Sequence, residues 1–377
     1  MNLLSISAPT GEEAPVRDYI LGELTRLGVR ESEIRVDDAP SRIALPCQTG
    51  NLIVQAGGDK PGPRRLLLAH MDTVPLARNA DPEVRGDRIV ALGRTALGGD
   101  DRAGVAAILT AFEELKRLDL PHPPLTLLFT VREESGLRGA AAVRLEDLGP
   151  TVPACAFNFD GGCPNEATIG ATGSMRLEIE IRGIAAHAGA HPEKGVSAIA
   201  AFAAAVVDLE RGGWLGLIQR PEGSGTSNIG VVQAGEATNV ITDGLHARAE
   251  ARSHEPRFLD KIVAEFRRAF MEAAAAHRNK AGRAAEVDVC AERSYSSFRL
   301  PQESPAVVAA LNAARAAGLQ PSTRVSNGGL DANWLTHRGV PTVSLGCGQH
   351  EIHTVEEYVL IEEYLAACRV ALALMEA

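Results

Sequence analysis

The sequence lacks the features that mark membrane, secreted and nucleic-acid-binding proteins. No apolar run approaches the roughly 18 residues that a membrane span requires. The first residues have neither the basic segment nor the long apolar core of a signal peptide. The formal net charge is −10 and no basic block is present, which argues against a nucleic-acid or anionic-membrane partner. We therefore expect a cytoplasmic protein.

Two further motifs are missing. The six cysteines show no C-x-x-C spacing, which favours reduced thiols over disulfides or a zinc knuckle. No G-x-G-x-x-G follows an expected strand, which disfavours a nucleotide-dependent oxidoreductase. Cys163 lies near the site described below, where we expect a packed thiol rather than a metal ligand.

What is present indicates an α/β protein of two domains. A chain of 377 residues exceeds what one hydrophobic core usually serves. Apolar strands alternate with helical stretches in residues 1–172 and again in 293–377, which predicts one domain built from both parts. Residues 173–292 instead alternate apolar with charged positions and follow the order β-α-β-β-α-β. That order predicts an inserted α+β, ferredoxin-like domain.

Acidic and imidazole side chains follow the expected strands of the first domain. The strand at 66–69 ends in His70-Met71-Asp72, and residues two apart in a strand project to the same side. Open α/β sheets place their chemistry at the carboxyl ends of the strands. The other polar groups in such positions are Asp100 and Asp101 before a helix, Glu133 and Glu134 after strand 125–131, and Asp160 after strand 154–159.

Each of these residues alone has an ordinary explanation. Acids at a helix start, for example, cap free N–H groups and complement the helix dipole. Their joint occurrence at one edge of a sheet is different, because crowded carboxylates repel one another unless a cation holds them. The set predicts a metal site.

In this order the motifs resemble those of the co-catalytic zinc aminoacylase, carboxypeptidase and peptidase T family. The matching motifs are His70-Met71-Asp72, Gly99-Asp100-Asp101-Arg102-Ala103-Gly104, Glu133-Glu134, Asp160-Gly161-Gly162, Ala186-His187-Ala188-Gly189, Thr238-Asn239-Val240-Ile241 and His353-Thr354. The resemblance implies a zinc-peptidase-like catalytic domain, with a mixed central sheet flanked by helices, and an inserted lid and dimerisation domain. The turns at Asp160 and at Gly329-Leu330-Asp331 lean toward the peptidase T branch.

The resemblance also implies a role for each residue of the first domain. Asp100 would bridge two divalent ions. Zinc is the expected metal, and cobalt and manganese are the alternatives. The remaining ligands would be His70 and Asp160 for the first ion, and Glu134 and His353 for the second. Asp72 would orient the imidazole of His70. Glu133 would be the general base, which takes a proton from the bridging water and so produces the metal-bridging hydroxide.

The resemblance further implies that three residues of the inserted domain contact the substrate. His187 would stabilise the oxyanion, often in the partner subunit's site, Asn239 would contact the substrate backbone, and Arg252 would hold a substrate carboxylate. His191 and His350 are weaker alternatives to His187 and His353. Arg102 stands where a lysine is common in the family, a difference that matters little if the side chain only makes a salt bridge.

The predicted function is a two-zinc metallopeptidase that hydrolyses small peptides, most like a tripeptide aminopeptidase, and that forms a homodimer through the inserted domain. The alternatives are a glutamate-type carboxypeptidase or an N-acyl amino-acid amidohydrolase, which share the ligands and differ in the pocket. A more remote alternative is a non-catalytic peptide-binding relative.

Overall fold

The computed structural model describes residues 1–377 and divides them into two compact units. The main unit comprises Met1–Ala171 and Phe298–Ala377, and the inserted unit comprises Thr172–Ser297. The sequence prediction placed the second boundary at residue 292. The inserted unit instead ends at Ser297, because its last strand continues to Tyr295.

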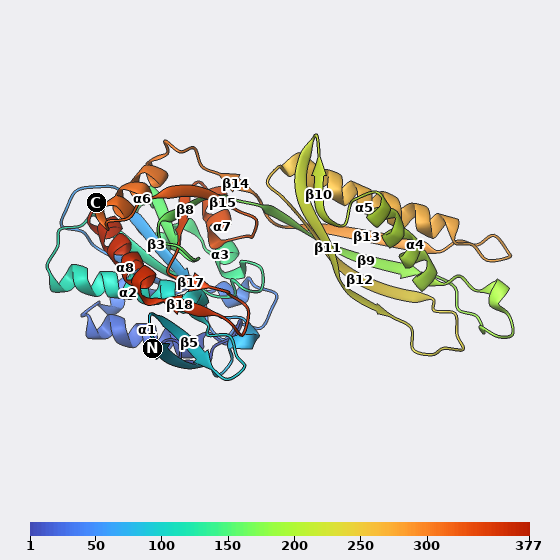
Figure 1. Ribbon diagram of the computed structural model, residues 1–377, viewed down its shortest axis with the longest axis horizontal. Helices are drawn as coiled ribbons and strands as arrows, with labels where there is room; N and C mark the ends of the chain where they lie inside the picture. Colours follow the sequence, from blue (N-terminus) through green and yellow to red (C-terminus); the bar gives the residue numbers. More distant parts are fainter. The chain divides into compact units, whose positions relative to one another are not determined.

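A nine-stranded mixed sheet forms the centre of the main unit (Figure 1). Its order is β1-β2-β6-β3-β7-β16-β8-β14, with β15 also paired to β8. The bounds are β1 Ile34–Val36, β2 Leu52–Ala56, β3 Arg65–His70, β6 Leu125–Thr130, β7 Cys155–Phe159, β8 Glu166–Ala171, β14 Phe298–Arg299, β15 Ser322–Ser326 and β16 Thr342–Leu345. The four strands β6, β3, β7 and β16 are mutually parallel neighbours. This sheet confirms the predicted fold class.

Helices cover both faces of the sheet. In β3, Leu67 and Ala69 join the larger hydrophobic core, to which α1, α2, α6 and α8 contribute, whereas Leu66 and Leu68 join a smaller core with α7. The bounds are α1 Ala14–Arg26, α2 Gly99–Arg117, α3 Arg138–Ala142, α6 Pro305–Ala316, α7 Asp331–His337 and α8 Ile361–Glu376. Burial on both faces explains why this strand is a continuous apolar run rather than an alternating one.

A small antiparallel sheet lies beside the main one. Its order is β17-β18-β5-β4, with bounds β4 Asp81–Arg85, β5 Arg88–Leu92, β17 Gln349–His350 and β18 Tyr358–Leu360. Strands β4 and β5 form a hairpin that turns at Gly86 and Asp87. The pairing of β5 with β18 was not predicted, and it anchors the loop 351–357 that carries His353.

The inserted unit is a five-stranded antiparallel sheet with two helices on one face (Figure 1). Its order is β10-β11-β12-β9-β13, with bounds β9 Gly173–Arg182, β10 Gly216–Arg220, β11 Gly223–Ala234, β12 Gly244–Ser253 and β13 Glu286–Tyr295. The helices are α4 Ala198–Arg211 and α5 Pro256–Ala276. Apart from the edge strand β10, which sequence reasoning missed, this is the ferredoxin-like order. Neither unit contains a helix with the length and apolar character needed to cross a bilayer.

Candidate metal centre

The candidate site lies at the carboxyl ends of three parallel neighbours, β6, β3 and β7. His70 is the last residue of β3, Asp160 directly follows β7, and Glu133 and Glu134 follow β6 by a few residues. Because parallel strands end at the same edge of a sheet, these side chains converge without any special loop.

His70 is held in place by Asp72. Its Nδ1 lies 3.0 Å from the backbone oxygen of Asp72 and 3.4 Å from Oδ1 of the same residue. The two carboxylate oxygens of Asp72 accept the backbone N–H groups of Glu133 at 3.0 Å and Glu134 at 3.2 Å. Asp72 is fully buried. One carboxylate therefore orients both the imidazole and the backbone that carries the two glutamates.

Asp100 lies between two imidazoles. Its Oδ1 is 3.2 Å from Nε2 of His70, and its Oδ2 is 3.2 Å from Nε2 of His353. Nε2 of His353 is also 2.9 Å from Oε1 of Glu134. The donor atoms form two groups, one of His70, Asp100 and Asp160 and one of Asp100, Glu134 and His353, and within each group they lie within 4.8 Å of one another. All five residues predicted as ligands are thus brought together, and Asp100 belongs to both groups.

The adjacent Asp101 faces the protein scaffold instead. Its oxygens accept the backbone N–H groups of His70 at 3.0 Å and Gly104 at 3.1 Å, and the side-chain amide of Gln349 at 2.7 Å. The backbone N–H of Asp100 donates to Glu357 Oε1 at 3.0 Å. The two neighbouring aspartates therefore have different surroundings, which the sequence alone did not distinguish.

Gly104 explains how helix α2 begins so close to the strand ends. A Cβ at this position would lie 1.9 Å from the carbonyl oxygen of Phe159, the last residue of β7. Any larger residue would push the start of the helix, and Asp100 with it, away from Asp160.

The electrostatics of the cluster favour a cation. Burial and the charge of Asp100 raise the pKa of Asp160 to about 7, and burial also raises the pKa values of Glu133 and Glu134. Hydrogen bonds to Asp100 and Glu134 raise the pKa of His353 to about 10. Without a cation, protons must relieve the crowding of negative charge. Imidazole nitrogens and carboxylate oxygens are ligands that suit zinc, so the donor set fits a divalent ion.

Asp331 is a further buried acid that sequence reasoning gave no role. One of its oxygens accepts the hydroxyl of Thr130, while Oδ1 is buried without a hydrogen-bond partner. Burial raises its pKa to about 6, and its charge acts on Glu133 and Asp160. The signal for it was the Gly-Gly-Leu-Asp turn, which was used only as a mark of family branch.

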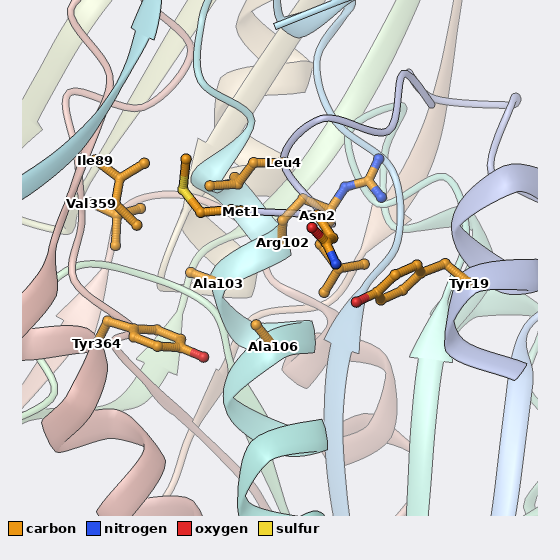
Figure 2. Close-up of a pocket in the computed structure, with 11 residues that line it drawn as sticks. Met1, Asn2, Leu4, Tyr19, Ile89, Arg102, Ala103, Ala106, Val359 and Tyr364 are labelled. Atoms are coloured by element: carbon orange, nitrogen blue, oxygen red, sulfur yellow. The ribbon is translucent and has the colours of Figure 1, made fainter. Parts of the chain in front are cut away.

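The arginine at position 102, where a lysine is common in the family, was expected to matter little if its side chain only makes a salt bridge. Arg102 makes no ion pair, so this expectation does not apply. It is 2% exposed, and its only hydrogen bond runs from Nη2 to the carbonyl oxygen of Ala8 at 3.2 Å. Burial lowers its pKa to about 10. Arg102 borders a cavity of about 350 Å³ among Leu4, Tyr19 and Tyr364 (Figure 2). None of the residues lining this cavity belongs to the two donor groups.

In the inserted unit, His187 is fixed by its own loop. Its Nδ1 accepts the backbone N–H groups of Gly189 and Ala190, both at 3.1 Å. A neutral imidazole that accepts at Nδ1 carries its proton on Nε2. In His191, the alternative to His187, Nδ1 lies 3.6 Å from Oε1 of Glu193.

Asn239 and Arg252 also belong to the inserted unit. The backbone oxygen of Asn239 accepts the N–H of Ala188 at 2.9 Å, which joins the two loop motifs of this unit. The guanidinium of Arg252 contacts both oxygens of Glu250, at 3.1 and 3.0 Å. The roles of His187, Asn239 and Arg252 in substrate binding stay predictions.

Taken with the fold, this arrangement defines a class of protein. A sheet with a parallel centre that has two histidines and several acids gathered at one edge can bind the divalent ions that activate water in many hydrolases. Residues 66–377, which begin at strand β3, match the profile of Peptidase family M20/M25/M40. The chain belongs to this family, and it is therefore a hydrolase that acts on peptides.

Two solved structures agree with this assignment, and a further relative is similar over the whole chain. A tripeptidase from Staphylococcus aureus subsp. aureus Mu50 has a TM-score of 0.88 and 31% identity, over 100% of this chain and 95% of that chain. The aminopeptidase PepT from Bacillus cereus ATCC 10987 has a TM-score of 0.83 and 32% identity, over 100% and 96%. The uncharacterized protein YqjE of Bacillus subtilis (strain 168) is 33% identical over 376 residues, 100% of this chain and 96% of that protein. The resemblance to the peptidase T branch is confirmed.

Proposed function

We propose that this protein is a two-zinc aminopeptidase that hydrolyses small peptides, tripeptides first among them. The observation that carries the proposal is the position of Asp100, whose two oxygens each face a different imidazole at 3.2 Å. A carboxylate placed in this way is suited to bridge two ions about 3.5–4 Å apart. The similarity to a tripeptidase and to an aminopeptidase supports the choice of substrate.

The chain offers each ion a separate set of ligands. His70 and Asp160 would hold the first ion, Glu134 and His353 the second, and Asp100 would contact both. When bound, such ions polarise a carbonyl group and lower the pKa of water toward neutrality.

Glu133 has the surroundings of a general base. It belongs to neither donor group, although its neighbour Glu134 does. Burial and the nearby charges of Asp160 and Asp331 raise its pKa well above the usual value. A carboxylate with a raised pKa holds the proton that it takes from the attacking water long enough to deliver it to the leaving amine. Asp72 supports this step because it accepts the backbone N–H of Glu133 at 3.0 Å.

The inserted unit would supply the remaining contacts. His187 would donate from Nε2 to the developing oxyanion, Asn239 would contact the substrate backbone, and Arg252 would exchange its partner Glu250 for a substrate carboxylate. A homodimer formed through this unit and a cytoplasmic location complete the proposal.

Replacement of the base tests the mechanism. Glu133→Gln keeps the shape of the side chain but cannot take up the proton, so we expect kcat to fall by about 10²–10⁴-fold while zinc content stays at the wild-type level. Glu146→Gln is a matched control, because the Glu146 side chain is 72% exposed and lies outside the cluster. A Glu133→Gln protein with most of its activity would rule out this base.

A peptide panel tests the substrate class. The panel contains a tripeptide with free termini, its N-acetyl form, its C-terminal amide and an N-acetyl amino acid. An aminopeptidase cleaves the first, rejects the second and, if Arg252 holds the carboxylate, is slow on the third. Cleavage of the N-acetyl tripeptide from its carboxyl end indicates a carboxypeptidase, and preference for the N-acetyl amino acid indicates an amidohydrolase. Metal-loaded protein that cleaves none of the four contradicts the proposal.

A further inference from the structure

A second group of metal-binding side chains lies outside the two-ion centre. It consists of Cys163, His350 and Glu363, whose donor atoms all lie within 4.8 Å of one another. Nε2 of His350 is 2.7 Å from Oε2 of Glu363, and Sγ of Cys163 is 3.8 Å from Oε1 of Glu363. None of the three belongs to the donor groups around Asp100.

The three side chains come from segments that are fixed against one another. Cys163 lies in the turn after β7, His350 ends β17, and Glu363 lies in the first turn of α8. The turn and the strand are joined because Gly348 N–H donates to the carbonyl oxygen of Gly162 at 2.7 Å. The donors are therefore largely positioned before any ion arrives.

The imidazole of His350 is further constrained by an aromatic neighbour. It stacks on the ring of Tyr358 with centroids 5.1 Å apart and an interplanar angle of 17°. Arg88 covers the same tyrosine ring, with its guanidinium carbon 4.4 Å from the centroid. The stacking holds the ring in the plane in which Nε2 points at Glu363.

The chemistry of this group suits zinc. Thiolate, imidazole and carboxylate are the three ligand types that zinc accepts, and a site with three protein ligands keeps a fourth position for water. All three residues are half-buried, so an ion can enter from solvent. Burial and the charge of Glu363 raise the pKa of the Cys163 thiol, and a cation between the two side chains reverses the effect of that charge.

We propose that Cys163, His350 and Glu363 form a third, accessory zinc site. On binding, the sulfur–metal bond forms as the thiol proton is released to solvent, so affinity rises with pH. The ion would connect the loop that carries Asp160, three residues before Cys163, to the loop that carries His353, three residues after His350. It would thereby fix two ligands of the two-ion centre relative to each other.

Cobalt(II) distinguishes this site from the two-ion centre. A cobalt–thiolate bond produces a charge-transfer absorption in the near ultraviolet, and none of the five ligands proposed for the two-ion centre carries sulfur. We expect cobalt titration of the metal-free protein to produce this band and Cys163→Ser to abolish it. Cys290→Ser is the control, because Cys290 is an exposed thiol of the inserted unit, and it should leave the band unchanged.

The other two ligands are tested by affinity. Even the outer partners of metal ligands change affinity by about 10–100-fold, so loss of a direct ligand should weaken the cobalt titration at least about tenfold. We expect this loss for both His350→Ala and Glu363→Gln. A band that is missing in the wild type, or that survives unchanged in Cys163→Ser, overturns the proposal.

A second measurement needs no variant. Added zinc should slow alkylation of Cys163 by iodoacetamide, as followed by peptide mass spectrometry, and should leave alkylation of Cys290 unchanged. Equal rates for Cys163 with and without zinc also overturn the proposal. Neither measurement depends on peptide hydrolysis, so failure here is distinguishable from failure of the proposed function.

Discussion

The replacement of Asp72 by asparagine tests how the site is assembled, because this residue binds no ion in the proposal. Its oxygens accept the backbone N–H groups of Glu133 and Glu134, and Oδ1 also lies 3.4 Å from Nδ1 of His70. An asparagine amide has one acceptor oxygen and one NH₂ group. The backbone N–H of Glu133 or of Glu134 would therefore face the NH₂ group of the asparagine, and the imidazole of His70 would lose its charged partner.

The size of the effect follows from these contacts. Loss of a carboxylate that orients a metal-binding histidine typically lowers metal affinity by about 10–100-fold. Since tenfold in affinity corresponds to about 1.4 kcal/mol, the expected loss is about 1.4–2.8 kcal/mol. The long 3.4 Å contact to His70 favours the lower end, whereas a shift of the Glu134 backbone, which carries a ligand of the second ion, favours the upper end.

Competition for zinc against a chromophoric chelator measures this loss on metal-free protein. Asp37→Asn is the matched control, because Asp37 is also buried and its Oδ1 accepts the backbone N–H groups of Ala39 and Asn51, both at 2.9 Å. Asp37 hydrogen-bonds to no residue of the cluster. If Asp72→Asn bound zinc as tightly as Asp37→Asn and the wild type, Asp72 would not have the orienting role assigned here.

Three further outcomes are expected. Gly104→Ala should lower the free energy of unfolding by about 1–3 kcal/mol or more, because the new Cβ overpacks against the Phe159 carbonyl. Gly22→Ala in helix α1 is the control: its Cβ meets nothing within 4 Å, so it should raise the free energy of unfolding by about 0.5–1 kcal/mol. Equal midpoints of the two variants in urea unfolding would contradict this. His187→Ala should lower kcat on a tripeptide by about 10²–10³-fold, the usual cost of losing an oxyanion donor, while His191→Ala stays near wild type; similar rates for the two variants would remove His187 from catalysis. Chelation of the ions should lower Tm, because a ligand at 100 times its Kd stabilises by about 2.7 kcal/mol, and zinc should restore it; a Tm indifferent to both treatments would mean that the folded chain binds no zinc.

The central strands and the polar residues that follow them were predictable from the sequence. The run at 66–69 is apolar at every position because both of its faces are buried, and such runs belong to parallel sheets. Once the strands are parallel, His70 and Asp160 must lie at one edge. The positions of these residues depend on chain direction rather than on fine packing.

Other parts of the site depend on pairings between distant segments, which leave little local signal. Gln349, which donates to Asp101, is positioned by the pairing of β17 with β18 and of β18 with the β4–β5 hairpin. Strands β17 and β18 have only two and three residues, so their sequences show no clear periodicity. The edge strand β10 was missed for a different reason: it forms a local hairpin with β11, but only Ile218 of its five residues is buried, so the strand shows no clear alternation. Asp331 is defined by its partner Thr130, about 200 positions earlier in the chain.

Residue type alone was a poor guide at Arg102 and did not reveal the surroundings of Cys163. Arg102 was considered only as a salt-bridging residue. Charged side chains are seldom buried unless paired, yet Arg102 is buried without an ion pair. Cys163 was expected to be a packed thiol, as isolated cysteines usually are. Its neighbours His350 and Glu363 come from segments near the other end of the chain, so only the structure shows the three donors together.

Anomalous diffraction at the zinc absorption edge, from crystals of the zinc-loaded protein, tests the central claim most directly. We predict two peaks that flank Asp100, one next to His70 and Asp160 and the other next to Glu134 and His353. An anomalous map without density at Asp100, or with a single ion there that contacts only one of the two imidazoles, would contradict the two-metal site.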